Sequence, residues 1–141
     1  GLAGALLREH CPGVHYLQDS GVELEGVKFW GSPWTPRFMN WAFNLDPGPD
    51  LARVWARVPA GVDVLITHGP PRDVLDKTRH NQHVGCADLA AALGRIQPRV
   101  HLFGHIHESA GEVTKAGVHF VNACTLDAFY KPANPARVIE L

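Results

Sequence analysis

The chain has 141 residues, enough for one domain with a buried core. Thirteen Lys and Arg residues nearly balance fourteen Asp and Glu, and no basic stripe suited to polymeric nucleic acid is present. No apolar run approaches the ~20 residues of a membrane-spanning helix. Three cysteines without a CxxC pair are typical of free thiols in a reducing compartment, so we expect a cytoplasmic protein that binds neither membranes nor polymeric nucleic acid.

The first residues predict a chain that is part of a longer protein. The sequence begins at Gly1 and its single methionine is Met39. Leucines recur at helical spacing in GLAGALLREHC, so we expect a helix that is already under way at residue 1. The stretch lacks the basic start of a signal peptide.

Two strands are predicted next, VHYLQ (residues 14–18) and VELEGVKFWG (22–31), with a turn at Glu25-Gly26 inside the second. Residues 31–49 hold four prolines and two tryptophans without a regular period, which predicts a long loop. Its aromatic side chains either wall a substrate pocket or anchor the loop over a sheet edge; they are Trp34, Phe38, Trp41 and Phe43.

The middle of the chain alternates helices and strands. Residues 50–57 predict a helix, and VDVLIT (62–67) is apolar enough for a strand buried on both faces of an α/β sheet. A second helix is expected in CADLAAALGRI (86–96), followed by the strand VHLFG (100–104). This order predicts a right-handed parallel crossover. Further strands are predicted at 112–115, 118–122 and in ARVIEL (136–141).

Histidines follow two of these strands at their carboxyl ends, where ligand sites of α/β sheets collect. His68 follows the first strand, and His105 and His107 follow the second. If residues 105–107 are extended, both imidazoles point to one face, with their anchor points on the backbone about 6.5–7 Å apart. Gly104 would then permit the bend that turns this face toward His68. The pattern predicts one metal ion or a pair of ions.

The ligand set leaves alternatives open. Three imidazoles match a mononuclear catalytic zinc site, whereas a two-metal site also needs carboxylates. Strand alternation points Glu108 to the other face, and Asp63 lies at the wrong end of its strand. A third alternative is a domain that only binds a partner. Asn122 either supports the ligands or makes a simple sheet-edge hydrogen bond. The other histidines are expected to be surface or core residues: His10, His15, His80, His83, His101 and His119.

LITHGPP followed by FGHIHE resembles the last two metal-binding motifs of the calcineurin-like metallophosphoesterases. The wider text, GSPWTP, VGC, VNACT and ANPARVIEL, is similar to the metallophosphoesterase-domain-containing subgroup, whose members include metal-dependent phosphodiesterases that act on cyclic nucleotides. The resemblance runs from about Val14 onward. It implies half of a two-sheet sandwich flanked by helices, α/β/β/α when complete, with residues 1–141 as the C-terminal part of a single domain.

The resemblance also implies a dinuclear centre of two divalent ions, whether Mn, Fe, Zn or Mg. His68 and His105 match ligands of one ion, and His107 matches a ligand of the other. The family's Asp-x-His, Gly-Asp and Gly-Asn-His motifs are absent from this chain. The bridging carboxylate and the general-acid histidine are therefore expected in a missing N-terminal half, and no catalytic residue is assigned here. The expected activity is hydrolysis of a small phosphate ester, for which these residues alone would not suffice.

Overall fold

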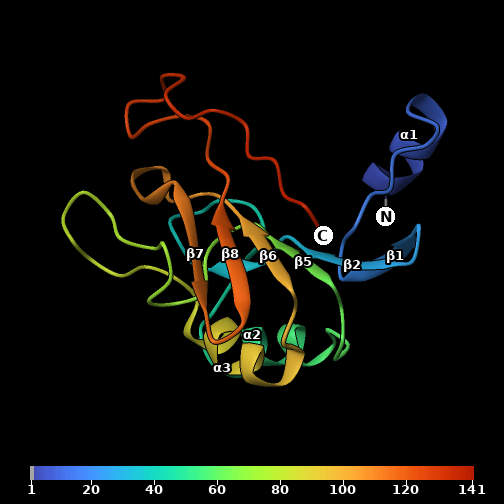
Figure 1. Ribbon diagram of the computed structural model, residues 1–141, viewed down its shortest axis with the longest axis horizontal. Coiled ribbons are helices and arrows are strands. Elements are labelled where there is room, and N and C mark those ends of the chain that lie inside the picture. The colour runs from blue at the N-terminus through green and yellow to red at the C-terminus, as the bar shows by residue number, and fades with distance from the viewer. Residues whose placement is uncertain (1) are drawn as a thin grey trace.

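The computed structural model describes residues 2–141 and contains a six-stranded sheet with the order β1-β2-β5-β6-β8-β7 (Figure 1). Neighbouring strands from β2 to β8 in this order are parallel, and β1 and β7 form antiparallel edges. The strands are β1 (Ser20–Leu24), β2 (Val27–Ser32), β5 (Val64–Thr67), β6 (Val100–Phe103), β7 (Gly111–Lys115) and β8 (Val118–Asn122). Two short strands, β3 (Thr35–Pro36) and β4 (Asn44–Leu45), pair inside the predicted loop.

Both antiparallel hairpins turn at two residues with positive φ. These are Glu25 and Gly26 between β1 and β2, and Ala116 and Gly117 between β7 and β8. Two such residues in succession match the twist of the flanking strands. The predicted turn at Glu25-Gly26 is therefore confirmed.

The helices are α1 (Leu2–His10), α2 (Pro49–Ala56) and α3 (Ala87–Ile96). α1 lies apart from the other two, beyond the β1 end of the sheet, whereas α2 and α3 lie side by side (Figure 1). The buried residues of α2 and α3 share one apolar core with alternate residues of the sheet, among them Leu65, Phe103 and Phe120. The predicted crossover is confirmed in that α3 joins the parallel neighbours β5 and β6.

The opposite side of the sheet carries Val64, Val100 and Val121, which are buried, and Ile66, which is 37% exposed. None of these four side chains belongs to the core under α2 and α3. The fold is a mixed α/β sheet with flanking helices, as predicted, and it agrees with one half of a two-sheet sandwich. No helix in the described range of residues 2–141 has the length and apolar character needed to cross a membrane.

Two predicted strands are absent from the described residues. VHYLQ does not pair, although a Cβ on Gly31 would lie 2.5 Å from the Cβ of Leu17, so this segment lies directly against β2 without joining its ladder. ARVIEL is also irregular, and Val138 is 92% exposed. Alternation of apolar and polar residues produces a strand only where one face can be buried.

Candidate metal site at the carboxyl ends of β5 and β6

The turn that carries His68 is supported from inside the core. Thr67, the last residue of β5, donates its hydroxyl hydrogen to the carbonyl of Gly69 at 2.7 Å. Its oxygen must therefore accept from Nε2 of His101, which lies 2.9 Å away. His101 is fully buried, and this burial lowers its pKa to about 3. A neutral histidine on β6 thus holds the turn after β5, while His68 itself is exposed.

His105 stands in a tight turn rather than in an extended strand, so the predicted geometry of residues 105–107 is wrong. β6 ends at Phe103, and His105 has φ +72°. For a residue other than glycine this conformation costs about 1–3 kcal/mol and often marks a functional position. The bend falls at His105 and not at Gly104, whose own φ is not positive. A Cβ at Gly104 would lie 3.4 Å from Sγ of Cys124, which is close to an ordinary van der Waals contact.

The turn brings His105 against His68, as predicted. The ring centroids lie 4.5 Å apart with planes tilted by 43°. Partial burial, followed by the proximity of His68 and His107, lowers the pKa of His105 to about 4. His105 is therefore neutral near pH 7 and keeps the lone pair that a metal ion requires.

His107 begins the short 3₁₀ helix η1 (His107–Ser109), where its ring is also oriented by a neighbour. Nδ1 lies 2.8 Å from the carbonyl oxygen of Asp127. A carbonyl can only accept, so Nδ1 carries a hydrogen, and in the neutral imidazole Nε2 then keeps its lone pair. Metal-binding histidines typically have this type of partner. The donor set of imidazoles, with His105 neutral and His107 oriented, therefore fits a divalent ion.

Asn122 connects the loops of the site. It ends β8, is fully buried, and donates from Nδ2 to the carbonyls of Ile106 at 2.8 Å and Leu75 at 3.2 Å. Its Oδ1 accepts the N–H of Cys124. Ile106 separates the two histidines of this loop, so Asn122 supports the backbone that carries them and makes more than a simple sheet-edge hydrogen bond.

An open pocket of about 610 Å³ adjoins the histidines and is lined by His105 and His107. Glu108 also lines it, so the prediction that this side chain points to the other face is wrong. Strand alternation does not continue past Phe103, because the chain turns there. Asp63 does lie at the far end of β5, as predicted, where it accepts the N–H of Lys28.

Both predicted roles of the aromatic loop are present, in different residues. Trp34 packs edge-on against Phe43 at 5.6 Å and against the core, so this pair anchors the loop. Phe38 and Trp41 are about half exposed and line the pocket. The ring of Trp41 stands edge-on to His105 at 6.1 Å.

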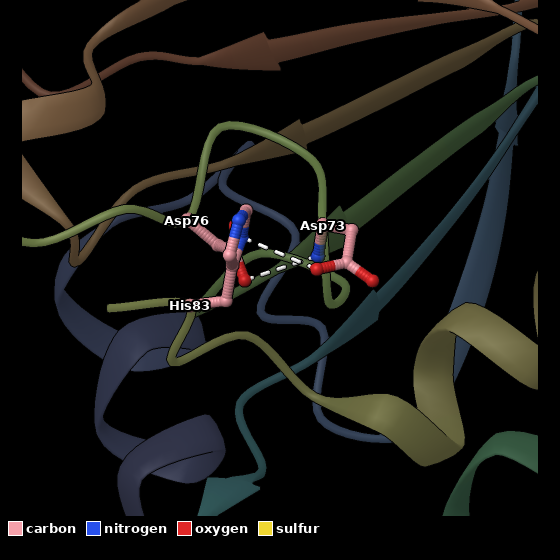
Figure 2. A group of neighbouring side chains, drawn as sticks. All are labelled: Asp73, Asp76 and His83. Carbon is pink, nitrogen blue, oxygen red and sulfur yellow. Dashed lines mark hydrogen bonds and ion pairs between the residues drawn. The ribbon is translucent and has the colours of Figure 1, made fainter. Parts of the chain in front are cut away.

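A second group of possible ligands lies on the loop between β5 and α3: Asp73, Asp76 and His83 (Figure 2). Within residues 2–141, it is the one set of three or more histidine, cysteine or acidic side chains whose ligand atoms all lie within 4.8 Å of one another. His68, His105 and His107 together do not meet this criterion, so the geometry gives no support to a mononuclear three-histidine zinc site.

The atoms of this second group are already bound to one another and to the backbone. Oδ1 of Asp76 lies 2.6 Å from Nδ1 of His83, and Oδ2 accepts the N–H groups of Asp73 and Gly85 at 3.0 and 2.9 Å. The Asp76 side chain is fully buried. This arrangement closes the loop and engages both oxygens of the Asp76 carboxylate within the protein. From the sequence, His83 is expected to be a surface or core residue, and no spacing around it signals this role.

Comparison with known proteins adds a second line of support. Metallophosphoesterase domain-containing protein 1 of Homo sapiens is 47% identical over 128 residues, which cover 89% of this chain, and the Mus musculus protein matches equally well. The chain belongs to the metallophosphoesterase domain-containing family. A UPF0046 protein of Caenorhabditis elegans is 46% identical over 110 residues, 77% of this chain and 28% of its own length.

The chain spans 39% of the length of the human and mouse metallophosphoesterase domain-containing proteins. No protein-family profile matches it. A solved crystal structure matches 86% of this chain and 51% of its own chain with a TM-score of 0.63 and 20% sequence identity. At this identity the likeness shows the fold alone. Family membership implies the use of divalent metal ions.

Proposed function

We propose that the chain contributes to a dinuclear metal centre that hydrolyses phosphate esters, with phosphodiesters such as cyclic nucleotides as the substrate class. His68 and His105 would hold one divalent ion and His107 the other. The observation that carries this proposal is the set of oriented imidazoles beside the pocket: the stacked His68–His105 pair, and His107 with Nε2 free. The 47% identity to a metallophosphoesterase domain-containing protein supports the same reading.

The roles of the chain's own residues follow from the pocket. The rings of Phe38 and Trp41 offer a flat apolar surface to an ester group. Arg37 lines the same pocket, with its guanidinium ion-paired with Asp46. Divalent ions, when bound, lower the pKa of a coordinated water and neutralise charge on phosphoryl oxygens. The bridging carboxylate and the general acid would come from residues beyond these 141. Three free cysteines suit a reducing compartment such as the cytoplasm.

The test is hydrolysis of bis(p-nitrophenyl) phosphate by the natural gene product that contains these residues, assayed with Mn²⁺, Zn²⁺ or Mg²⁺ and after chelation. We expect metal-dependent turnover that is lost in His105→Ala and retained in His83→Gln. Absence of turnover with every ion would contradict the proposal. Metal binding without turnover would favour a domain that binds a partner.

A further inference from the structure

The orientation of His107 depends on a backbone atom that lies 20 residues further along the chain. The carbonyl oxygen of Asp127 accepts the Nδ1–H of His107 at 2.8 Å. In free neutral imidazole the hydrogen can occupy either ring nitrogen. Whichever group places the Asp127 carbonyl therefore decides which nitrogen of His107 stays free.

The carboxylate of the same residue closes the turn that presents this carbonyl. Oδ1 of Asp127 accepts the N–H groups of Phe129 at 2.8 Å and Lys131 at 3.0 Å. The backbone N–H of Asp127 donates to the carbonyl of Lys131 at 2.9 Å, and its carbonyl also accepts the N–H of Tyr130 at 3.0 Å. Tyr130 has φ +59°, a conformation that needs such a network to persist. The side-chain carboxylate, the backbone N–H and the carbonyl of Asp127 thus all take part in the hydrogen bonds that close this turn.

Both ends of this turn are tied to the loop that carries the histidines. The carbonyl of Thr125 accepts the N–H of Asn134, whose side chain donates to the carbonyl of Cys124, each at 3.0 Å. Cys124 in turn donates its N–H to Asn122, which holds the carbonyl of Ile106. The segment that contains the Asp127 turn is therefore connected to the backbone between His105 and His107 through these hydrogen bonds and the short stretches of chain between them.

We infer that Asp127 is a positioning residue of the site: its carboxylate closes the turn that holds its own carbonyl on Nδ1 of His107, and this keeps Nε2 free for a divalent cation. The assignment of the cation rests on the proposed function. The position of the hydrogen on His107 does not, because it can be measured without metal or substrate.

The experiment is a two-bond ¹H–¹⁵N correlation spectrum of the chelated, ¹⁵N-histidine-labelled protein, recorded at a pH where the imidazoles are neutral. For the unmodified protein we expect His107 to carry its hydrogen on Nδ1. Asp127→Ala should shift the ratio of the two tautomers toward Nε2–H by roughly tenfold, about the effect of one lost hydrogen bond. Asp127→Asn keeps an oxygen at the Oδ1 position, so it should restore the original tautomer.

Lys131→Ala is the matched control, because it removes a side chain of the same turn but keeps the backbone N–H that Asp127 accepts. It should leave the His107 signals unchanged. Hydrogen on Nε2 in the unmodified protein overturns the inference, and this result does not require any variant to fold. Unchanged Nδ1–H in Asp127→Ala also overturns it. Nδ1–H in a protein without hydrolase activity would refute the proposed function and leave the role of Asp127 standing.

Discussion

Two groups of histidine and acidic side chains lie on the loops that follow β5 and β6, and they differ in which atoms are already bound. In the Asp73–Asp76–His83 group the ligand atoms are close together, but the buried carboxylate of Asp76 already accepts hydrogen bonds from His83 and two backbone N–H groups. In the His68–His105–His107 group the rings are more widely spread, yet His107 keeps a free nitrogen. Mutual distance alone therefore does not identify the metal site, because a ligand also needs an available lone pair.

The largest expected effect concerns the Asp73–Asp76–His83 group. Asp76→Ala leaves the buried N–H groups of Asp73 and Gly85 without their acceptor, at about 1–3 kcal/mol each, so the free energy of unfolding should fall by about 3 kcal/mol or more. Urea unfolding measures this loss. Asp73→Ala is the matched control and should cost far less, since this side chain is 61% exposed. Equal losses in both variants would show that the carboxylate of Asp76 does not organise the loop.

Metal affinity separates the two groups directly. His105→Ala should weaken binding of Mn²⁺ or Zn²⁺ by roughly 10–100-fold, an effect at least as large as that of losing a group that orients a ligand. His83→Ala should leave the metal affinity unchanged, because Nδ1 of His83 is hydrogen-bonded to Asp76 and closes the loop. Isothermal titration of the chelated protein checks both. The reverse order of effects would assign the ion to the Asp73–Asp76–His83 group.

The support behind His68 predicts a pH dependence of stability. His101 has a pKa of about 3 in the folded protein and near 6.5 when unfolded. Between these values the unfolded chain binds more protons, so the free energy of unfolding falls as the pH is lowered through this window. At pH 5 the loss relative to neutral pH is about 2 kcal/mol.

His101→Gln can donate to Thr67 from a similar position but does not titrate, so its urea-unfolding stability should vary less between pH 7 and pH 5. His80→Gln, at an exposed position, is the control and should follow the unmodified protein. If His101→Gln does not change how the free energy of unfolding varies with pH, His101 is not neutral in the folded protein.

The smallest expected effect is on substrate binding at the aromatic wall. Trp41→Ala removes aromatic contacts worth about 0.5–1.5 kcal/mol, so KM for a p-nitrophenyl ester should rise a few-fold with little change in metal affinity. Phe43→Ala removes the anchoring ring that packs on Trp34 and should not change KM in a folded protein. A large loss of metal affinity in Trp41→Ala would instead make this ring a support of His105.

Several features were predictable because they depend on local patterns. The apolar run before His68, followed by a helical pattern at 86–96 and the strand VHLFG, predicted β5 and β6 as parallel neighbours with histidines at their carboxyl ends. Expectations failed where a pattern was extended past its element. The turn at His105 reversed the predicted direction of Glu108, and VHYLQ alternates without pairing because it lies against β2 instead.

The sequence by itself determined the order of the helices and of the six strands of the large sheet, the turn at Glu25-Gly26, and the histidines that follow β5 and β6, since these follow from periodicity and residue type. Only the tertiary structure decided which nitrogen atoms are free. His107 is bound by a carbonyl 20 residues away along the chain, and His101 by a hydroxyl 34 residues away. The carboxylate of Asp76 accepts from an N–H group 9 residues away. No periodicity in the sequence encodes these pairs. A hydrogen bond between loops depends on where the sheet ends each strand, and that is a property of the whole fold.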